Sequence, residues 1–278
     1  RLRAMCAAPT RPGVNGGRTS GDLLVAPRRR PVRQRRGARV LYITTEGFQD
    51  VPFLQRVDRK FHYDLDWERP QPLVHRRDCL GVAERVDYQG SIVDPLEPSD
   101  LDAIVALVRT HLRNRDGDPV ALAINFLFAY AHPAHEQAVR NRLNEEFPNV
   151  PISVSHEVAP IWREYERAST TIADAAVKPL MQTFVGALDH GLKSRGFDRD
   201  WAVMKSNGGQ MLARASADRP IQTVLSGLSG GIIAGKAIGE RQDDQNIISF
   251  DMGGTSTDVG VVANGAIGYT TAWEIEFG

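Results

Sequence analysis

IISFDMGGTSTDV, residues 247–259, is the stretch that decides the fold. Its apolar start predicts a buried strand that delivers Asp251 to its end. Two glycines follow, and because they lack side chains their backbone N–H groups can approach a phosphate closely. Hydroxyl side chains then add donors before the next strand begins. The residues expected to contact nucleotide phosphates are Gly253, Gly254, Thr255, Ser256, Thr257 and Asp258.

Asp251 is the candidate catalytic and metal-binding residue. Mg²⁺ prefers oxygen ligands and retains several waters, so a carboxylate at the mouth of a phosphate loop suits it. The order of strand, acid, paired glycines, hydroxyls and hairpin resembles the phosphate loops of the actin, sugar-kinase and heat-shock-ATPase fold. That resemblance implies ATP and Mg²⁺ as cofactors. The competing interpretation is a tight hairpin closed by an Asx-type turn.

A second glycine-rich stretch covers residues 225–237. Read from Gly230 it nearly matches a P-loop, with Lys236 in place, but Ala237 stands where a Ser or Thr should hold magnesium. We therefore reject a P-loop. Gly230 and Gly231 are expected near a helix N-terminus that faces the nucleotide. Close packing through small residues is the alternative.

Strand and helix patterns alternate through the rest of the chain. Strands are expected at residues 39–44, 120–130, 151–155 and 201–205, and helices at 99–112, 133–147, 169–195 and 220–240. Ser99 is expected to cap the first helix, and Pro179 to kink the third. Asn264-Gly265 predicts a hairpin turn between strands 258–263 and 266–271. The alternation predicts an α/β fold with parallel strand pairing.

Residues 1–36 do not share this pattern. They hold ten arginines and one acid, Asp22, with no apolar periodicity. A basic arm for nucleic acid and an Arg-rich transit peptide are two interpretations. We favour a third, a non-native segment from a truncated or out-of-frame start. Since the formal net charge of the whole chain is zero, the rest is acidic, which argues against nucleic-acid binding by the folded part.

The chain is expected to reside in the cytoplasm. Its two cysteines, Cys6 and Cys79, make a disulfide framework improbable, and Cys79 is expected to be a small packed residue. No apolar run approaches the roughly 18 residues of a membrane span, and no signal-peptide pattern occurs.

Charged residues and histidines near residue 156 do not predict a metal site. His132, His135 and His156 are too loosely spaced for a metal signature. The dense charges between His156 and Arg167 are expected to form exposed ion pairs at the start of a helix.

Five motifs in order resemble the hydantoinase A/5-oxoprolinase family. They are Thr44–Val51, Ser155–Val158 followed by Arg163–Thr171, Ser206–Gly209, Ser226–Gly231 and Asp251–Val259. The resemblance implies an N-terminal hydantoinase/oxoprolinase domain at residues 37–165 and the first part of a hydantoinase A domain at 166–278.

What the resemblance implies for function is ATP-driven opening of a cyclic amide, of the hydantoin or 5-oxoproline type. It also implies a small-molecule substrate and a hydantoinase B-like partner subunit. Within the family, residues 61–65, 204–205 and 273–278 look closer to the ATP-using subunit of acetone carboxylase. Carboxylation of a ketone is therefore the first alternative.

The sequence departs from the family at both ends. The family carries an earlier Asp-x-Gly-Gly-Thr phosphate loop, which residues 1–36 do not contain, and it continues for hundreds of residues beyond the second loop. The expected actin-like fold is therefore incomplete, lacking the first phosphate loop and the C-terminal part. The chain alone is expected to be catalytically inactive, and an inactive nucleotide-binding or assembly module is the second alternative.

Overall fold

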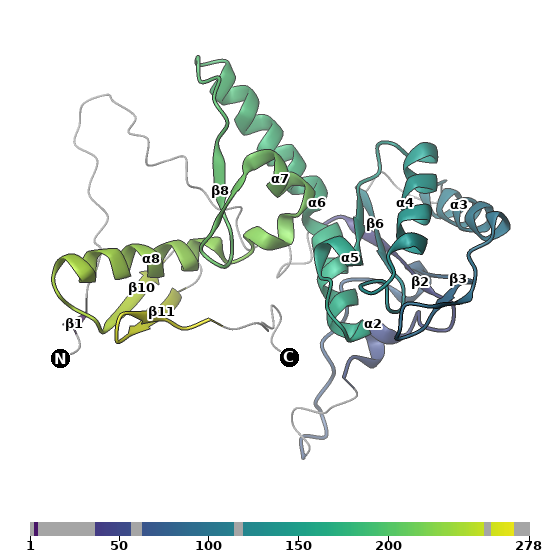
Figure 1. The fold of residues 1–278 in the computed structure, drawn as a ribbon, viewed down its shortest axis with the longest axis horizontal. Coiled ribbons are helices and arrows are strands. Elements are labelled where there is room, and N and C mark those ends of the chain that lie inside the picture. Colours follow the sequence, from purple (N-terminus) through teal and green to yellow (C-terminus); the bar gives the residue numbers. More distant parts are fainter. Residues whose placement is uncertain (1–2, 5–36, 57–62, 114–118, 253–256, 270–278) are drawn as a thin grey trace. The chain divides into compact units, whose positions relative to one another are not determined.

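The computed structural model describes residues 3–4, 37–56, 63–113, 119–252 and 257–269 (Figure 1). The chain divides into two compact units, each with its own sheet. Unit 1 comprises residues 1–29, 189–216 and 222–274, and unit 2 comprises residues 30–188, 217–221 and 275–278.

Unit 2 is built on a fully parallel sheet with the strand order β3-β2-β6-β7. Its strands are β2 (Arg39–Thr45), β3 (Cys79–Val82), β6 (Val120–Asn125) and β7 (Ile152–Val154). Smaller elements around it are α2 (Val51–Leu54), η2 (Arg76–Asp78), β4 (Arg85–Val86) and β5 (Ile92–Asp94). The predicted α/β architecture with parallel pairing is confirmed.

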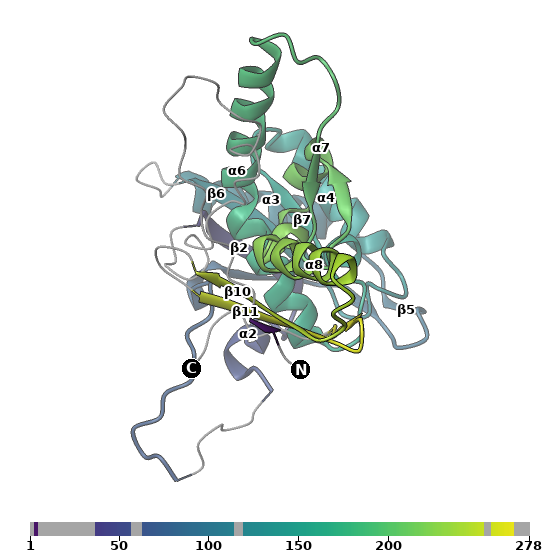
Figure 2. The ribbon, with the colours of Figure 1, turned by 90° about the vertical axis from the view of Figure 1, so that its left-hand side faces the viewer.

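Helices cover both faces of this sheet. On one face, α3 (Pro98–Arg113) and α4 (Ala134–Glu146) pack against Leu41 and Ile43 of β2. On the other face, α6 (Glu164–Lys193) packs against Val40 and Tyr42 (Figures 1 and 2). Successive β2 side chains point to opposite faces, and because both faces are buried the strand is apolar almost throughout.

Three predicted boundaries in unit 2 are wrong, and one of them is the start of the helix expected at residue 169, because α6 begins at Glu164. Ser99 lies inside α3 instead of capping it, and the Asp100 carboxylate accepts the Glu97 N–H (3.0 Å) at the helix start. The strand expected to reach residue 130 ends at Asn125. It ends there because the next backbone N–H, of Phe126, donates to a carboxylate instead of to a neighbouring strand.

That carboxylate belongs to Glu136, a fully buried residue at the carboxyl edge of the sheet. It accepts hydrogen bonds from the Phe126 N–H (2.9 Å), the Ser155 hydroxyl (2.6 Å) and the His156 N–H (3.1 Å). It also lies 2.6 Å from His156 Nδ1. Glu136 therefore joins α4 to the loop after β6 and to α5 (Ser155–Val158).

A second buried carboxylate, Glu84, lies near the end of β2. The Thr45 hydroxyl donates to it, His135 Nδ1 lies 2.8 Å from it, and the Leu127 N–H donates to Thr45 Oγ1 (3.1 Å). Burial raises the pKa of Glu84 above its ordinary value. Glu84 contacts Thr45 and Glu136 contacts His156. Together the two glutamates therefore hold segments that span 111 positions of the sequence.

Arg167 completes this polar layer and corrects the expectation of exposed ion pairs. Only 1% of it is exposed. Its guanidinium donates to Asn125 Oδ1 (2.9 Å) and to the carbonyls of Phe126 (2.9 Å) and Ile161 (2.8 Å). Burial lowers its pKa below the usual value. Arg167 is buried because its position on the first turn of α6 directs it under the carboxyl edge of the sheet.

Unit 1 holds the glycine-rich motifs. Its sheet has the order β1-β10-β11-β12, with β1 (Arg3–Ala4), β10 (Ile247–Met252), β11 (Thr257–Ala263) and β12 (Ala266–Ile267). A two-stranded sheet pairs β8 (Ala202–Met204) with β9 (Gln210–Leu212). The chain also forms α7 (Ala213–Asp218), η3 (Pro220–Thr223) and α8 (Ser226–Arg241).

The hairpin turn predicted at Asn264-Gly265 is confirmed. Both residues adopt positive φ, 51° and 73°, as a two-residue turn with the twist of the flanking strands requires. The strand after it is shorter than predicted and ends at Ile267. Of residues 1–36 the structure describes Arg3 and Ala4, which pair in parallel with Ile247 and Ile248.

One helical stretch among the described residues, Pro220–Arg241, is long and apolar enough to cross a membrane by length and composition. Its mean hydropathy is 1.2, and a single helix of this kind is weak support for a span because the core helix of a soluble protein meets the same criterion. The expected absence of a membrane span therefore stays a prediction.

The Glu136 network generates a stability prediction. Glu136→Ala removes the acceptor of three hydrogen bonds and leaves their donors buried, so we expect a loss of about 3 kcal/mol in the free energy of unfolding. Urea denaturation followed by circular dichroism measures it. The matched control is Glu145→Ala on the exposed side of the same helix, expected to cost less than about 0.5 kcal/mol. Equal losses for the two variants would contradict this account.

Candidate functional site

Asp251 and Asp258 face each other across the β10–β11 ladder. They are paired in register, one step before the glycine loop that joins the two strands. Met252 and Thr257 form the last pair, and Asp251 is exposed. The structure therefore brings two of the predicted site residues, both acids, to the mouth of the loop, and Thr257 beside them.

Four of the predicted phosphate-binding residues lie outside the described residues. They are Gly253, Gly254, Thr255 and Ser256. The strands on either side of this segment are described up to Met252 and from Thr257, and these two residues pair with each other. Their phosphate contacts stay a prediction.

Helix α8 lies directly on the hairpin (Figures 1 and 2). Gly260 of β11 lies so close to Ile232 that an added Cβ would clash with it. A Cβ on Gly235 would lie 3.5 Å from the Ser249 side chain, and one on Gly239 would clash with Ile247. Glycines on both elements therefore permit the close approach.

The order of these contacts fixes the direction of α8. Its C-terminal Gly239 lies by Ile247, at the start of β10, whereas Ile232 lies by Gly260, which pairs with Ser249. Going back along α8 therefore means going forward along β10. The N-terminus of α8 points toward the Asp251 end of the hairpin, where the free N–H groups of a helix start favour an anion.

Gly230 and Gly231 lie within α8 and not in a loop, which agrees with rejecting a P-loop. A Cβ on Gly230 would lie 3.1 Å from Met204 Sδ of β8, a packing contact. A Cβ on Gly231 would meet no atom within 4 Å. Close packing thus explains Gly230, whereas Gly231 has no packing reason to be a glycine.

The Ser206–Gly209 turn joins the same assembly. The Ser206 hydroxyl donates to the Val224 carbonyl, and the Ser229 hydroxyl of α8 donates to the Ser206 carbonyl. Gly208 adopts φ 82°, and its Cα lies against Ile233 of α8. Three glycine motifs that are separated in the sequence are therefore linked through α8. Ser229 belongs to the Ser226–Gly231 motif, but nothing in its sequence context predicts its contact with Ser206.

The acids at the hairpin mouth have the right chemistry for Mg²⁺. Among the described residues no group of three His, Cys, Asp or Glu side chains could hold a metal ion. Two carboxylates on one face of the hairpin instead match a cation that is bound by one or two carboxylates, by water and by phosphate oxygens. Asp251 and Asp258 would hold it.

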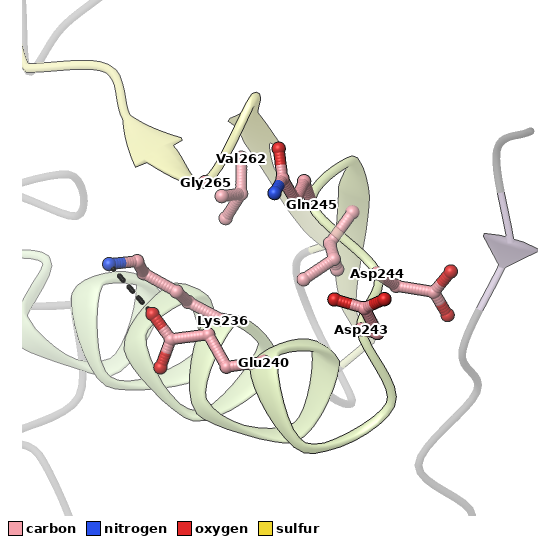
Figure 3. Close-up of a pocket in the computed structure, with 8 residues that line it drawn as sticks. Lys236, Glu240, Asp243, Asp244, Gln245, Val262 and Gly265 are labelled. Carbon is pink, nitrogen blue, oxygen red and sulfur yellow. Dashed lines mark ion pairs between the residues drawn. The ribbon is translucent and has the colours of Figure 1, made fainter.

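A hollow of about 130 Å³ lies at the opposite end of α8 (Figure 3). Lys236 and Glu240 form an ion pair at its wall (3.1 Å), and the Asp243–Gln245 turn closes it. Ile247, at the start of β10, also lines it. Because Asp251 lies at the other end of that strand, the hollow is not part of the candidate site.

Comparison with known proteins finds two matching family models. Residues 167–277 match the hydantoinase/oxoprolinase model, and residues 31–147 match the hydantoinase/oxoprolinase N-terminal region. The Aromatoleum aromaticum acetophenone carboxylase gamma subunit is 31% identical over 250 residues, covering 84% of this chain and 33% of that protein. The Pseudomonas jessenii caprolactamase subunit alpha is 26% identical over 239 residues, covering 85% and 34%.

A solved structure agrees with these matches. The nucleotide-free structure of acetone carboxylase, from work on the mechanism of ATP-dependent acetone carboxylation, has a TM-score of 0.73 and 29% identity. It covers 86% of this chain and 34% of that one. The chain thus spans about one third of the length of these two curated relatives.

Fold and site together define an α/β protein with a parallel sheet in one unit and, in the other, a glycine-loop hairpin bordered by paired acids. The matches to the two family models identify the family of the chain. It belongs to the hydantoinase/oxoprolinase family.

The packing of α8 generates a prediction with a matched pair of substitutions. Gly239→Ala places a Cβ against Ile247 and 2.9 Å from the Asp244 carbonyl, so we expect destabilisation by about 1–3 kcal/mol. Gly231→Ala, in the same helix, meets open space and should stabilise by about 0.5–1 kcal/mol. Thermal unfolding measures both. A stabilised Gly239→Ala variant would show that α8 does not lie on the hairpin as described.

Proposed function

We propose that this chain supplies a phosphate-binding hairpin to an ATP-dependent enzyme of the hydantoinase/oxoprolinase type. The observation that carries the proposal is the in-register pair Asp251 and Asp258 on either side of a Gly-Gly-Thr-Ser loop. The direction of α8 supports it, since the helix N-terminus points to the same end of the hairpin. This arrangement supports an actin-like fold for unit 1.

Each part of the hairpin has a role in this proposal. The N–H groups of Gly253 and Gly254 and the hydroxyls of Thr255, Ser256 and Thr257 would bind phosphate oxygens. Asp251 and Asp258 would hold Mg²⁺, which neutralises phosphate charge when bound. Gly231, at the N-terminal half of α8, leaves room for a ligand group to approach the helix backbone.

The substrate class follows from the family. We propose a cyclic amide of the hydantoin or 5-oxoproline type, whose amide oxygen ATP activates before ring opening. Because the amide C–N bond of the ring is stable, its hydrolysis must be coupled to activation by ATP. We propose a hydantoinase B-like partner subunit for the hydrolysis step. The alternative is carboxylation of a ketone, which the similarity to acetophenone carboxylase and acetone carboxylase favours.

Substrate-dependent ATP turnover distinguishes these two functions. An assembly of this protein with its partner would release phosphate in the presence of 5-oxoproline or hydantoin if it opens cyclic amides, and in the presence of acetone with bicarbonate if it carboxylates ketones. The domain boundary at residue 165, the cytoplasmic location and the inactivity of the chain on its own remain predictions beside this proposal.

Asp251→Asn tests the hairpin directly. Loss of the carboxylate charge should weaken binding of Mg·ATP at least about tenfold, because Mg²⁺ would lose an anionic ligand. Isothermal titration with Mg·ATP, and with ATP in EDTA, measures the change and its dependence on metal.

The control for this test is Asp243→Asn, which removes an exposed acid at the other end of the hairpin and should leave the affinity unchanged. If Asp251→Asn and Asp243→Asn bind Mg·ATP as tightly as the unsubstituted chain, the paired acids do not hold the metal. The tight-hairpin interpretation would then replace the proposal.

A further inference from the structure

Two of the family motifs lie outside the phosphate hairpin, at the carboxyl edge of the unit 2 sheet. Thr44–Val51 begins at the end of β2, and Ser155–Val158 follows β7 directly. In sheets of this kind, ligands bind outside the carboxyl ends of the parallel strands. A ligand of unit 2 is therefore expected at this edge.

The connections between the strands single out one point on that edge. β2 lies between β3 and β6 in the sheet. The connection that leaves β2 packs Val51 and Phe53 on the face that α6 covers, whereas the connection that leaves β6 contains α4, on the opposite face. Neighbouring strands whose connections leave to opposite faces form a topological switch point, where small ligands bind. In unit 2 this point lies between the ends of β2 and β6, at Thr45 and Asn125.

A carboxylate and an imidazole form a dyad beside the switch point. Glu84, whose side chain is completely buried, lies 2.8 Å from His135 Nδ1. It also accepts from the hydroxyl of Thr45, the last residue of β2. The N–H of Leu127, two residues after the end of β6, donates to Thr45 Oγ1 (3.1 Å). The dyad is thus tied to the ends of both strands that form the switch point.

The second ring nitrogen of His135 is open to a ligand. The side chain is 9% exposed, and Nε2 forms no hydrogen bond with any described residue and is not an enclosed atom. An ionised Glu84 can only accept, so it holds the proton on Nδ1 and leaves the lone pair on Nε2. His156 differs, because its Nδ1 lies 2.6 Å from Glu136 and its Nε2 lies 3.9 Å from Glu157.

The loop between β6 and α4 adds an independent observation. Phe128 has φ 54°, in the left-handed region that disfavours a residue with a Cβ. Backbone strain of this kind clusters at ligand sites, where the surrounding structure maintains it. The same loop carries His132, a half-buried residue whose ring centre lies 6.1 Å from that of His135. The dyad therefore borders a strained loop that is partly accessible to solvent.

We propose that His135 and Glu84 form a binding site for a small molecule that donates an N–H or O–H group to His135 Nε2. A cyclic amide carries such an N–H, and bicarbonate carries such an O–H. The choice of these two ligands rests on the proposed function, whereas the site rests on the dyad. Glu84 is a positioning residue, because it fixes the tautomer and the orientation of the ring. The dyad thus presents one acceptor in a fixed direction.

A nuclear magnetic resonance titration of the chain, with isotopically labelled histidine and at constant pH, tests the proposal. The probes are 5-oxoproline and, separately, sodium bicarbonate. We expect the ring resonances of His135 to shift saturably with one of them, while those of His75, an exposed histidine of unit 2, stay in place. His135→Asn should weaken binding at least about 20-fold, because the Asn amide can still donate to Glu84 whereas Nε2 is lost. The matched control, His75→Gln, should change the affinity less than about twofold.

The outcomes separate this inference from the proposed function. If bicarbonate alone shifts His135, the site stands and the proposed cyclic-amide substrate is contradicted. If neither probe shifts the His135 resonances, or His135→Asn binds as tightly as the unsubstituted chain, the inference is overturned. Binding of Mg·ATP by the hairpin is measured separately and does not depend on that result. Circular dichroism shows whether His135→Asn is folded, and if it is not, the resonances of the unsubstituted chain decide.

Discussion

The close approach of α8 to the β10–β11 hairpin is the constraint on which unit 1 depends. Ile232 occupies the space that a side chain at Gly260 would need, and Gly239 leaves the corresponding space to Ile247. This contact buries Ile247 and Val262, which are the core of the hairpin. It also sets the direction of α8, and so places the helix N-terminus toward the acids that border the glycine loop.

Unit 2 depends on a different constraint, the burial of charge at one edge of a parallel sheet. Glu84, Glu136 and Arg167 are almost completely buried, and each is satisfied by hydrogen bonds from segments far away in the sequence. Buried charges of this kind are costly unless all their partners are present. The layer therefore specifies the path of the segments that follow β2, β6 and β7.

Much of the fold could be predicted because it rests on local patterns. The apolar run of β2 and the Asn264-Gly265 turn each require a particular backbone, and both are confirmed. The end of β6 could not be predicted, because the Phe126 N–H finds its acceptor on a helix ten positions further along the chain. Periodicity carries no information about that contact.

The same limit applies to the sites. Asp251 and Asp258 are predicted by a single motif, and the ladder register places them opposite each other. Arg167 belongs to an equally distinctive motif, yet its burial depends on Asn125, 42 positions earlier, so a surface ion pair was the local expectation. Motifs thus indicate which residues matter, whereas tertiary contacts decide whether they are buried or exposed.

The most direct test of the phosphate hairpin is a nuclear magnetic resonance titration of the isotopically labelled chain with Mg·ATP. Binding by the hairpin should move the amide resonances of Gly253, Gly254 and Thr255 together with those of the first turns of α8. Resonances near Lys236 and Gln245, at the far end of the helix, should stay in place. Shifts confined to that far end, or none at saturating nucleotide, would contradict the account.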